Sequence, residues 1–385
     1  DQGAAPQAPD GSDAEPAADG APASSEEEGE PGPPTPATGK WVRHGAGWSY
    51  ELPDGTLLKN GVFDVEGGRY AFDARGYVPL GWYRDPSGVW YASTENGVRT
   101  GWYREGGSWY HLGEGGAMTT GWLSSGGSWY YLAATGQMVT GWSRVDGSWY
   151  HFDASGAMAA STWVRSGSWY YLGGSGAMAT GWFVAGGTWY YADASGAMMT
   201  GWVLTDGSWY HLDSSGALST GWLRDGGGSW YYLEPSTKLM ATGYTIIDNT
   251  AYYLDDTTGA MVTGWKKIGE KWFYFDSDGA PKTGWLAGRR GAWYYLDGDG
   301  AMLTGWAFIG YRWYYLDDGG AMATGWTKVG DQWFYLYSGG SMATGWLQQG
   351  STWYYLRPSG VMAANDVVAI DGVSHIFGPD GAWQG

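Results

Sequence analysis

Tryptophan recurs through this sequence at a nearly fixed interval, in most cases directly after glycine. Such Gly-Trp steps place tryptophan at Trp82, Trp102, Trp122, Trp142, Trp182, Trp202, Trp222, Trp265, Trp285, Trp306, Trp326 and Trp346. The interval is about 20 residues, which is typical of arrays of small repeated units. A unit of this size cannot bury a hydrophobic core alone and must stack on its neighbours.

Each repeat predicts a β-hairpin. In the segment from Trp202 to Trp209, two short aromatic stretches, "GWVLT" and "SWYHL", flank the turn signal "DG". The turn can fall at Thr205-Asp206 or at Asp206-Gly207. Both registers place Trp202 and Trp209 on one face, because side chains alternate along a strand. Tyr210 must then point to the other face, where the next hairpin would meet it.

The predicted fold is therefore all-β: a solenoid of tandem β-hairpins of about 20 residues each, arranged as a superhelix over residues 40–385. Residues 1–39 differ in composition. They are rich in Ala, Pro and Gly and contain nine acidic residues but no Lys or Arg. A segment of this kind cannot bury enough apolar surface to order itself, so it is predicted to be a disordered acidic linker.

Composition excludes several functional classes. The chain carries a net charge of -18 and has no Cys. The acidic charge argues against nucleic-acid binding, which requires a basic surface. The missing Cys excludes disulfides and thiolate metal sites. No stretch is apolar enough for a membrane-spanning helix. We expect no nucleic-acid partner and no membrane span.

No catalytic or cofactor motif is present. The sequence lacks the zinc-protease, nucleophile-elbow and phosphate-loop patterns. Of the five His, three stand where other repeats have Tyr. The recurrent Asp of "DSSG" suits a turn, where Asp accepts backbone N–H groups, with calcium binding as the alternative. We expect no metal, no cofactor and no enzyme, although a catalytic domain could lie before residue 1.

The aromatic residues admit two interpretations. They are either a stacking core that makes the repeats a structural stalk, or the walls of ligand sites between hairpins. A cage of two Trp and one Tyr suits a cation that cannot donate hydrogen bonds, such as a quaternary ammonium group. The third residue of the "WYY" pattern changes to His at His111, His151 and His211, whereas the middle residue stays aromatic. A residue that forms the wall of a site should stay aromatic in this way, so the middle residue is the candidate wall.

The repeats "TGWVLTDGSWYHLDSSGALSTGW" and "TGWKKIGEKWFYFDSDGAPKTGW" resemble the choline-binding, or cell-wall-binding, repeats of Gram-positive surface proteins and murein hydrolases. The resemblance covers about residues 40–385. It implies a secreted or cell-surface module that anchors a protein to the wall. It also implies that choline groups of teichoic or lipoteichoic acid sit between consecutive hairpins, caged by two Trp, a Tyr and often a Met.

Carried to this sequence, the resemblance implies seven cages. They are Trp102, Trp109 and Tyr130; Trp122, Trp129 and Tyr150; Trp182, Trp189 and Tyr210; Trp202, Trp209 and Tyr231; Trp265, Trp272 and Tyr294; Trp306, Trp313 and Phe334; and Trp326, Trp333 and Tyr354. Met118, Met138, Met198 and Met322 are candidate further walls, with gap-filling in the core as the alternative.

Several repeats depart from the pattern. Trp163 and Trp169 are six apart. The pairs Trp82/Trp90, Trp222/Trp230 and Trp285/Trp293 are eight apart, so sites there are expected to be altered. The repeat near Tyr244 has Ala251 in place of its second Trp and is expected to be the weakest point of the array. A glucan-binding or peptidoglycan-binding repeat module remains the alternative function, because Trp also stacks on sugar faces.

Overall fold

The computed structural model describes residues 38–45 and 47–385. The predicted linker, residues 1–39, therefore lies outside the described residues except for its last two. The described chain is built from tandem antiparallel hairpins, and the predicted all-β hairpin fold is confirmed. The chain divides into two compact units between Ser219 and Thr220, and each is described by itself.

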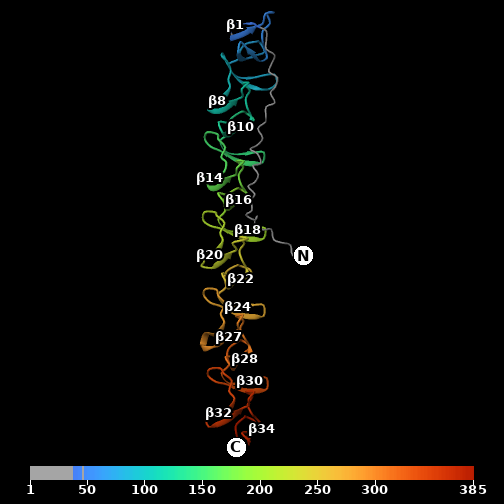
Figure 1. The fold of residues 1–385 in the computed structure, drawn as a ribbon. Coiled ribbons are helices and arrows are strands. Elements are labelled where there is room, and N and C mark those ends of the chain that lie inside the picture. Colours follow the sequence, from blue (N-terminus) through green and yellow to red (C-terminus); the bar gives the residue numbers. More distant parts are fainter. Residues whose placement is uncertain (1–37, 46) are drawn as a thin grey trace. The chain divides into compact units, whose positions relative to one another are not determined.

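In the first unit, successive pairs of strands form hairpins (Figure 1). One sheet has three strands, because β7 adds to β5–β6. The strands are β1 (Lys40–His44), β2 (Gly47–Glu51), β3 (Gly61–Val65), β4 (Gly68–Phe72), β5 (Gly81–Arg84), β6 (Trp90–Thr94), β7 (Gly97–Val98), β8 (Gly101–Glu105), β9 (Ser108–Leu112), β10 (Gly121–Ser125), β11 (Ser128–Leu132), β12 (Gly141–Val145), β13 (Ser148–Phe152), β14 (Thr162–Ser166), β15 (Ser168–Leu172), β16 (Gly181–Ala185), β17 (Thr188–Ala192), β18 (Gly201–Thr205) and β19 (Ser208–Leu212).

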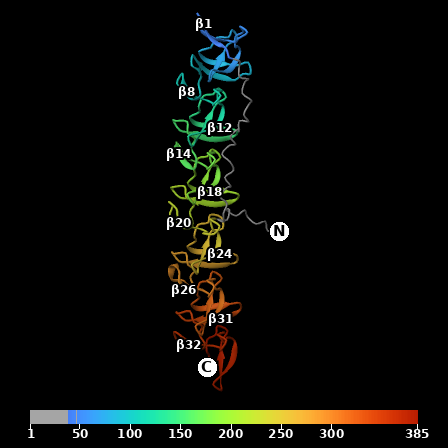
Figure 2. The same ribbon diagram turned by 45° about the horizontal axis from the view of Figure 1, so that its top comes forward.

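The second unit repeats this design, and its hairpins are also seen in Figure 2. Its elements are β20 (Gly221–Arg224), β21 (Trp230–Leu233), β22 (Gly243–Ile247), β23 (Thr250–Leu254), β24 (Gly264–Ile268), β25 (Lys271–Phe275), β26 (Gly284–Ala287), the 3-10 turn η1 (Arg289–Gly291), β27 (Trp293–Leu296), β28 (Gly305–Ile309), β29 (Arg312–Leu316), β30 (Gly325–Val329), β31 (Gln332–Leu336), β32 (Gly345–Gln349), β33 (Thr352–Leu356), β34 (Asp366–Ile370) and β35 (Val373–Phe377).

The hairpin register follows the second of the two predicted alternatives. In β18–β19, Thr205 pairs with Ser208, so the turn is Asp206-Gly207. Both turn residues have positive φ, 51° and 75°, as a tight hairpin turn that matches the strand twist requires. Trp209 consequently stands opposite Leu204, on the same face as Trp202.

The buried core consists mainly of the residue that ends the second strand of each hairpin. Leu112, Leu132 and Leu172 in the first unit are fully buried, as are Leu296, Leu316 and Leu336 in the second. Many of the second tryptophans, by contrast, keep about two-fifths of their surface exposed, for example Trp109 at 40% and Trp313 at 45%. The aliphatic residue therefore forms the core, and part of each such indole remains available to a ligand.

Consecutive hairpins are joined by a recurring backbone hydrogen bond. The N–H of Met138, in the loop after β10–β11, donates to the carbonyl of Trp109 in the preceding hairpin at 2.8 Å. The same bond joins Met118 to Trp90, Met158 to Trp129, Met178 to Trp149, Met198 to Trp169 and Leu218 to Trp189 in the first unit, and Met261 to Trp230, Met302 to Trp272, Met322 to Trp293, Met342 to Trp313 and Met362 to Trp333 in the second.

Glycine in the next loop makes room for the Met side chain. Gly136 has φ +79°, and a Cβ atom there would lie 2.2 Å from Sδ of Met118. Gly156 and Gly176 stand in the same way against Met138 and Met158. The Gly of "SGAM" is therefore required twice, for its positive φ and for the close approach of the thioether.

Hairpin β22–β23 lacks this connection. The position that Met occupies in other loops is held by Pro281 in the loop after β24–β25. Proline has no N–H, so it cannot donate to the carbonyl of Ala251. Tyr244 and Ile246 on β22 are 57% and 70% exposed. These features agree with the expectation that this repeat is the weakest, which stays a prediction.

We expect Pro281→Met to stabilise hairpin β22–β23 against local opening, because it can restore the missing hydrogen bond. One net hydrogen bond is worth about 0.5–1.5 kcal/mol, which corresponds to about 2- to 10-fold slower amide exchange from Gly243 to Leu254. Hydrogen exchange followed by mass spectrometry measures this change, with hairpin β30–β31 as the internal control. Exchange in β22–β23 that is no faster than in β30–β31 of the native chain would contradict the prediction.

Candidate ligand-binding cages

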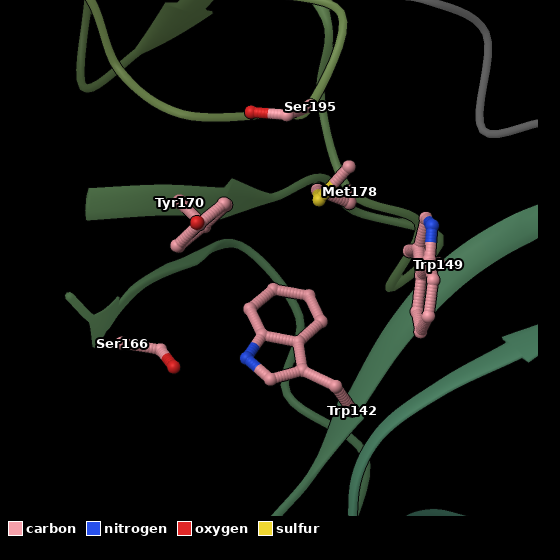
Figure 3. Close-up of a pocket in the computed structure, with 6 residues that line it drawn as sticks. All are labelled: Trp142, Trp149, Ser166, Tyr170, Met178 and Ser195. Atoms are coloured by element: carbon pink, nitrogen blue, oxygen red, sulfur yellow. The ribbon is translucent and has the colours of Figure 1, made fainter. Parts of the chain in front are cut away.

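An open cavity lies where hairpin β12–β13 meets hairpin β14–β15 (Figure 3). Trp142 comes from β12, Trp149 from β13 and Tyr170 from β15, while Met178 follows in the next loop. The side chains face a common space, with Ser166 and Ser195 at its edge. The cavity holds about 200 Å³. Sites for drug-sized ligands hold roughly 300–1,000 Å³, so this cavity lies below that range.

The central contact of each cage is an edge-to-face pair between the first Trp of one hairpin and the middle aromatic of the next. Trp142 and Tyr170 have ring centroids 5.1 Å apart with an interplanar angle of 66°. In the predicted cages the corresponding distances are 4.8 Å for Trp102–Tyr130, Trp122–Tyr150, Trp182–Tyr210 and Trp326–Tyr354, 5.1 Å for Trp265–Tyr294 and 4.7 Å for Trp306–Phe334.

The second Trp stands almost perpendicular to the first. The two rings are 6.4 Å apart in Trp102–Trp109 and Trp122–Trp129, and 6.5 Å apart in Trp306–Trp313, with angles of 82–88°. In three further hairpins the second Trp has the same register, opposite the residue two positions after the first Trp. The pairs are Val184 with Trp189, Lys267 with Trp272 and Lys328 with Trp333. Trp202 and Trp209 also lie 6.4 Å apart. Their grouping with Tyr231, which belongs to the second unit, stays a prediction.

The structure brings together rings in repeats for which altered sites were expected. Trp82 lies 6.4 Å from Trp90 and 4.9 Å from Tyr110, although the two Trp are eight apart in sequence. Trp222 similarly lies 6.3 Å from Trp230 and 4.9 Å from Tyr252. The ring geometry is unaltered because the extra residue falls in the turn, as the sequence indicates: Arg84 still pairs with Trp90, and Arg224 with Trp230. Whether these two sites bind differently stays a prediction.

Further cages were not among the seven predicted ones. Cavities are lined by Trp163, Trp169 and Tyr190 together with Met198, by Trp222, Trp230 and Tyr252 together with Met261, and by Trp346 and Trp353 together with His375 and Trp383. The cage of Trp142, Trp149 and Tyr170 was also missed. Its Trp spacing of seven was a sufficient signal, but the irregular repeat that follows it obscured the partner.

The Met residues belong to cages by a simple rule: each follows the hairpin that supplies the middle aromatic. Met138 is therefore bonded to Trp109, within a predicted cage. Met198 lines the cavity of Trp163 and Trp169. Met118 is bonded to Trp90 and Met322 to Trp293, so both lie beside cages in repeats whose Trp are eight apart. Leu218 takes this place beside Trp189.

The cage walls already attract cations within the protein. The guanidinium of Arg104 lies 5.8 Å from the ring centroid of Trp109, its cross-strand neighbour. Trp90, Trp169 and Trp230 carry an Arg in the same way. None of the six residues around the cavity of Trp142 is charged. Aromatic faces attract cations through the ring quadrupole, and no charged residue lines this cavity to compete for them.

The recurrent Asp residues serve the turns. One carboxylate oxygen of Asp153 accepts N–H groups from Ser155 and Ala157, together with the Ser155 hydroxyl. The Ser155 hydroxyl is the main reason that the pKa of Asp153 is lowered. Asp193 and Asp213 do the same in their own loops. Among the described residues, no group of three or more His, Asp or Glu is arranged to hold a metal ion.

Two of the repeat histidines are half-buried behind their cages. His111 packs against Trp102, with ring centroids 5.2 Å apart, and its Nδ1 lies 3.0 Å from the Thr119 hydroxyl. His211 packs against Trp202 and lies 2.9 Å from the Ser219 hydroxyl. Burial lowers the pKa of both imidazoles, although Asp213 opposes this effect for His211.

We expect these two His to make the fold less stable as pH falls below neutrality. Their pKa values are lowered in the folded chain, so the unfolded chain binds protons first as pH falls through about 6.5, and the free energy of unfolding decreases. The double variant His111→Tyr/His211→Tyr, which adopts the residue of other repeats, should lose less stability between about pH 7.5 and pH 5. Thermal unfolding at both pH values measures this.

The lower pH of the comparison, about 5, is chosen so that the Asp carboxylates do not contribute to the difference in stability. The lowered pKa values of Asp153, Asp193 and Asp213 give stability that is lost only when pH falls below about 4. An equal loss of stability in the native chain and in the double variant would show that the two His do not contribute.

No curated protein matches this chain. A family model described as choline-binding repeat matches residues 99–140, 120–163, 139–180, 164–201, 262–304, 303–336 and 323–366. A second model, described as putative cell wall binding repeat, matches residues 200–218 and 220–236. In the described part of the chain, no helix has the length and apolar character to span a membrane.

Solved structures from Streptococcus pneumoniae are similar in sequence. Choline-binding protein F is 32% identical over 74% of this chain and 98% of its own, with a TM-score of 0.42. The same protein in the presence of a peptidoglycan analogue, a tetrasaccharide-pentapeptide, gives 32% over the same shares with a TM-score of 0.37. The modular autolysin LytC, in complex with a synthetic peptidoglycan ligand, is 23% identical over 63% of this chain and 52% of its own, with a TM-score of 0.32.

The first family model alone spans more than half of the residues, and it does so with the repeats that carry the Trp–Tyr cages. The chain belongs to the choline-binding repeat family.

Proposed function

We propose that this chain anchors a secreted or surface protein to the cell wall by caging choline groups of teichoic or lipoteichoic acid between its hairpins. The observation that carries the proposal is the repeated cage itself. In the cages of Trp102, Trp122 and Trp306, two Trp at nearly right angles stand beside the middle aromatic of the next hairpin. The second Trp keeps a large exposed fraction, as at Trp149 with 43%.

The chemistry of the cage suits a quaternary ammonium group. Such a group has a positive charge spread over methyl groups and no hydrogen to donate, so it is held best by ring faces. Burial and the nearby Asp206 raise the pKa of Tyr210, so this phenol stays neutral at physiological pH. Met adds a polarizable thioether that favours contact with rings and methyl groups.

A single cage gives only weak binding. A cation on one aromatic face gains roughly 0.5–2 kcal/mol, so three faces give about 4 kcal/mol after the cost of ordering a small ligand. That corresponds to a Kd of about 1 mM. A polymer that displays many choline groups can engage several cages at once, and avidity can then exceed single-site affinity by about 10² to 10⁴. The repetition of the cage would therefore supply the strength of anchoring.

Glycan binding is the second candidate. It is favoured by the hydroxyl and carboxyl groups at the cage edges, such as Ser166, Ser195 and Asp278, which suit the hydroxyls of a sugar stacked on Trp. A third possibility is that the repeats serve only as a structural stalk. The three functions differ in which soluble compound competes for the protein.

We expect the chain to bind a resin that carries quaternary amines and to be eluted by free choline but not by dextran at the same concentration. The protein should stay bound to the resin in NaCl at the same concentration, because the cages act through ring faces and not through the net charge of -18. Elution by NaCl as readily as by choline would show simple ion exchange. Elution by dextran would favour the glycan-binding function.

We expect the joint replacement of Trp109, Trp129, Trp313 and Trp333 by Ala to remove four choline sites. Calorimetry should show four fewer sites of unchanged affinity, because each substitution opens one cage. Retention on choline-bearing walls should fall by more than tenfold, because fewer sites engage the polymer together.

The matched control replaces four exposed residues that lie outside the cages, Leu80, Tyr244, Ile246 and Tyr311, by Ala. These substitutions remove a comparable number of exposed apolar groups and should leave the number of choline sites unchanged. An unchanged number of sites in the Trp variant would contradict the assignment of the cages.

A further inference from the structure

The last two hairpins of the described chain enclose a cavity with a different set of walls. Trp346 from β32 and Trp353 from β33 face His375 from β35 and Trp383 from the segment that follows. The cavity holds about 450 Å³. The family model ends its match at residue 366, so two of the four walls lie beyond the residues that the family accounts for.

The geometry is nevertheless that of a cage. Trp346 lies 6.3 Å from Trp353 at 83°, and 5.1 Å from His375 at 82°. His375 therefore occupies the place of the middle Tyr. Trp383 occupies the place of Met, because its backbone N–H donates to the carbonyl of Trp353 at 2.8 Å. Its ring lies 5.6 Å from Trp346.

A hydrogen bond inside the cage links the imidazole to one of the indoles. The indole Nε1–H of Trp383 donates to Nδ1 of His375 at 3.1 Å. Indole nitrogen is only a donor, so in this contact Nδ1 is the acceptor, which matches an imidazole that carries its proton on Nε2. Protonation at Nδ1 would set two donors against each other and would place a positive charge in the cage wall.

The polar groups of the cage are largely satisfied by each other. With Nε1–H of Trp383 bonded to Nδ1 of His375, the walls offer a ligand mainly three indole faces and one imidazole face. Such walls suit a group that needs no hydrogen bonds, whereas a sugar would leave its hydroxyls without partners.

We propose that Trp346, Trp353, Trp383 and His375 form an additional quaternary-ammonium site that accepts its ligand only while His375 is neutral. This inference rests on the proposed function, because it assigns the same class of ligand to a cage of different composition. A protonated His375 repels the cationic ligand at contact distance, whereas the Tyr of the other cages stays neutral over the same pH range.

The charged groups on the neighbouring elements are engaged elsewhere or belong to turns. Asp366, on β34, pairs with Arg357. Asp380 accepts the N–H of Ala382 in the final loop, and Asp371 lies in the turn between β34 and β35. His375 packs against the rings of Trp346 and Trp383 and pairs across the hairpin with Val368, and these three residues are uncharged. The charge of His375 itself is therefore the one that the ligand would sense.

The test follows the imidazole signals of the full chain by NMR while choline chloride is added. The signal of His375 is assigned by its loss in His375→Tyr, a variant that adopts the residue of the other cages. At about pH 8, where histidine is neutral, choline should shift this signal. At a choline concentration ten times the site's Kd, the titration midpoint of His375 should fall by about one pH unit, because the ligand binds only the neutral form.

Calorimetry on the same proteins provides the second measurement. At about pH 5, the His375→Tyr variant should show one more choline site than the native chain, and at about pH 8 the same number. If the chain binds choline but the His375 signal does not move at saturation, this inference is overturned while the proposed function stands. A midpoint that stays constant or rises overturns the dependence on neutral His375. A chain that binds no choline at all overturns the proposed function itself.

Discussion

The edge-to-face contact between the first Trp of one hairpin and the middle aromatic of the next underlies both the fold and the proposed sites. An isolated two-stranded hairpin is only marginally stable in water, so each one depends on its neighbour. Pairs such as Trp102–Tyr130 and Trp306–Phe334, 4.8 and 4.7 Å apart, supply part of that stability. Such pairs add about 0.5–1.5 kcal/mol beyond the area they bury. The same two rings form two walls of a cage.

Within each repeat, different residue types form the core and the walls of the proposed site. The aliphatic residue at the end of each second strand, such as Leu132 or Leu316, is fully buried and forms the core. The backbone of Met and the second Trp forms the hydrogen bond between hairpins. The side chain of that Trp is thereby left partly exposed, as at Trp109 and Trp272. This division allows a wall residue to be replaced without removing the core.

Much of this design could be predicted from sequence, because the signals are local. The Asp206-Gly207 turn and the spacing of Trp202 and Trp209 place two rings on one face of a hairpin, and the structure has that register. The extra residue of the eight-residue pairs was also placed in the turn, where the structure has it, but the sequence alone could not show that the ring geometry survives the insertion.

The sequence also could not show which cage each Met belongs to. Each Met reaches back past one hairpin, so its cage is fixed by the stacking of the hairpins and not by the repeat that contains it. Met198 beside Trp163 and Trp169 illustrates this. The last cage was missed for a related reason, since His375 and Trp383 resemble neither Tyr nor Met in sequence and are identified only by where their backbones lie.

In the proposed cages, ring faces recognise the positive charge of the ligand and not only its shape. The most direct test is calorimetry of the full chain with choline and with dimethylbutanol, its neutral analogue in which carbon replaces nitrogen. We predict Kd values of about 1 mM per site for choline and at least about tenfold weaker binding of the analogue. Equal affinity for the two compounds would contradict the account, because the cages would then act as apolar pockets without selectivity for a cation.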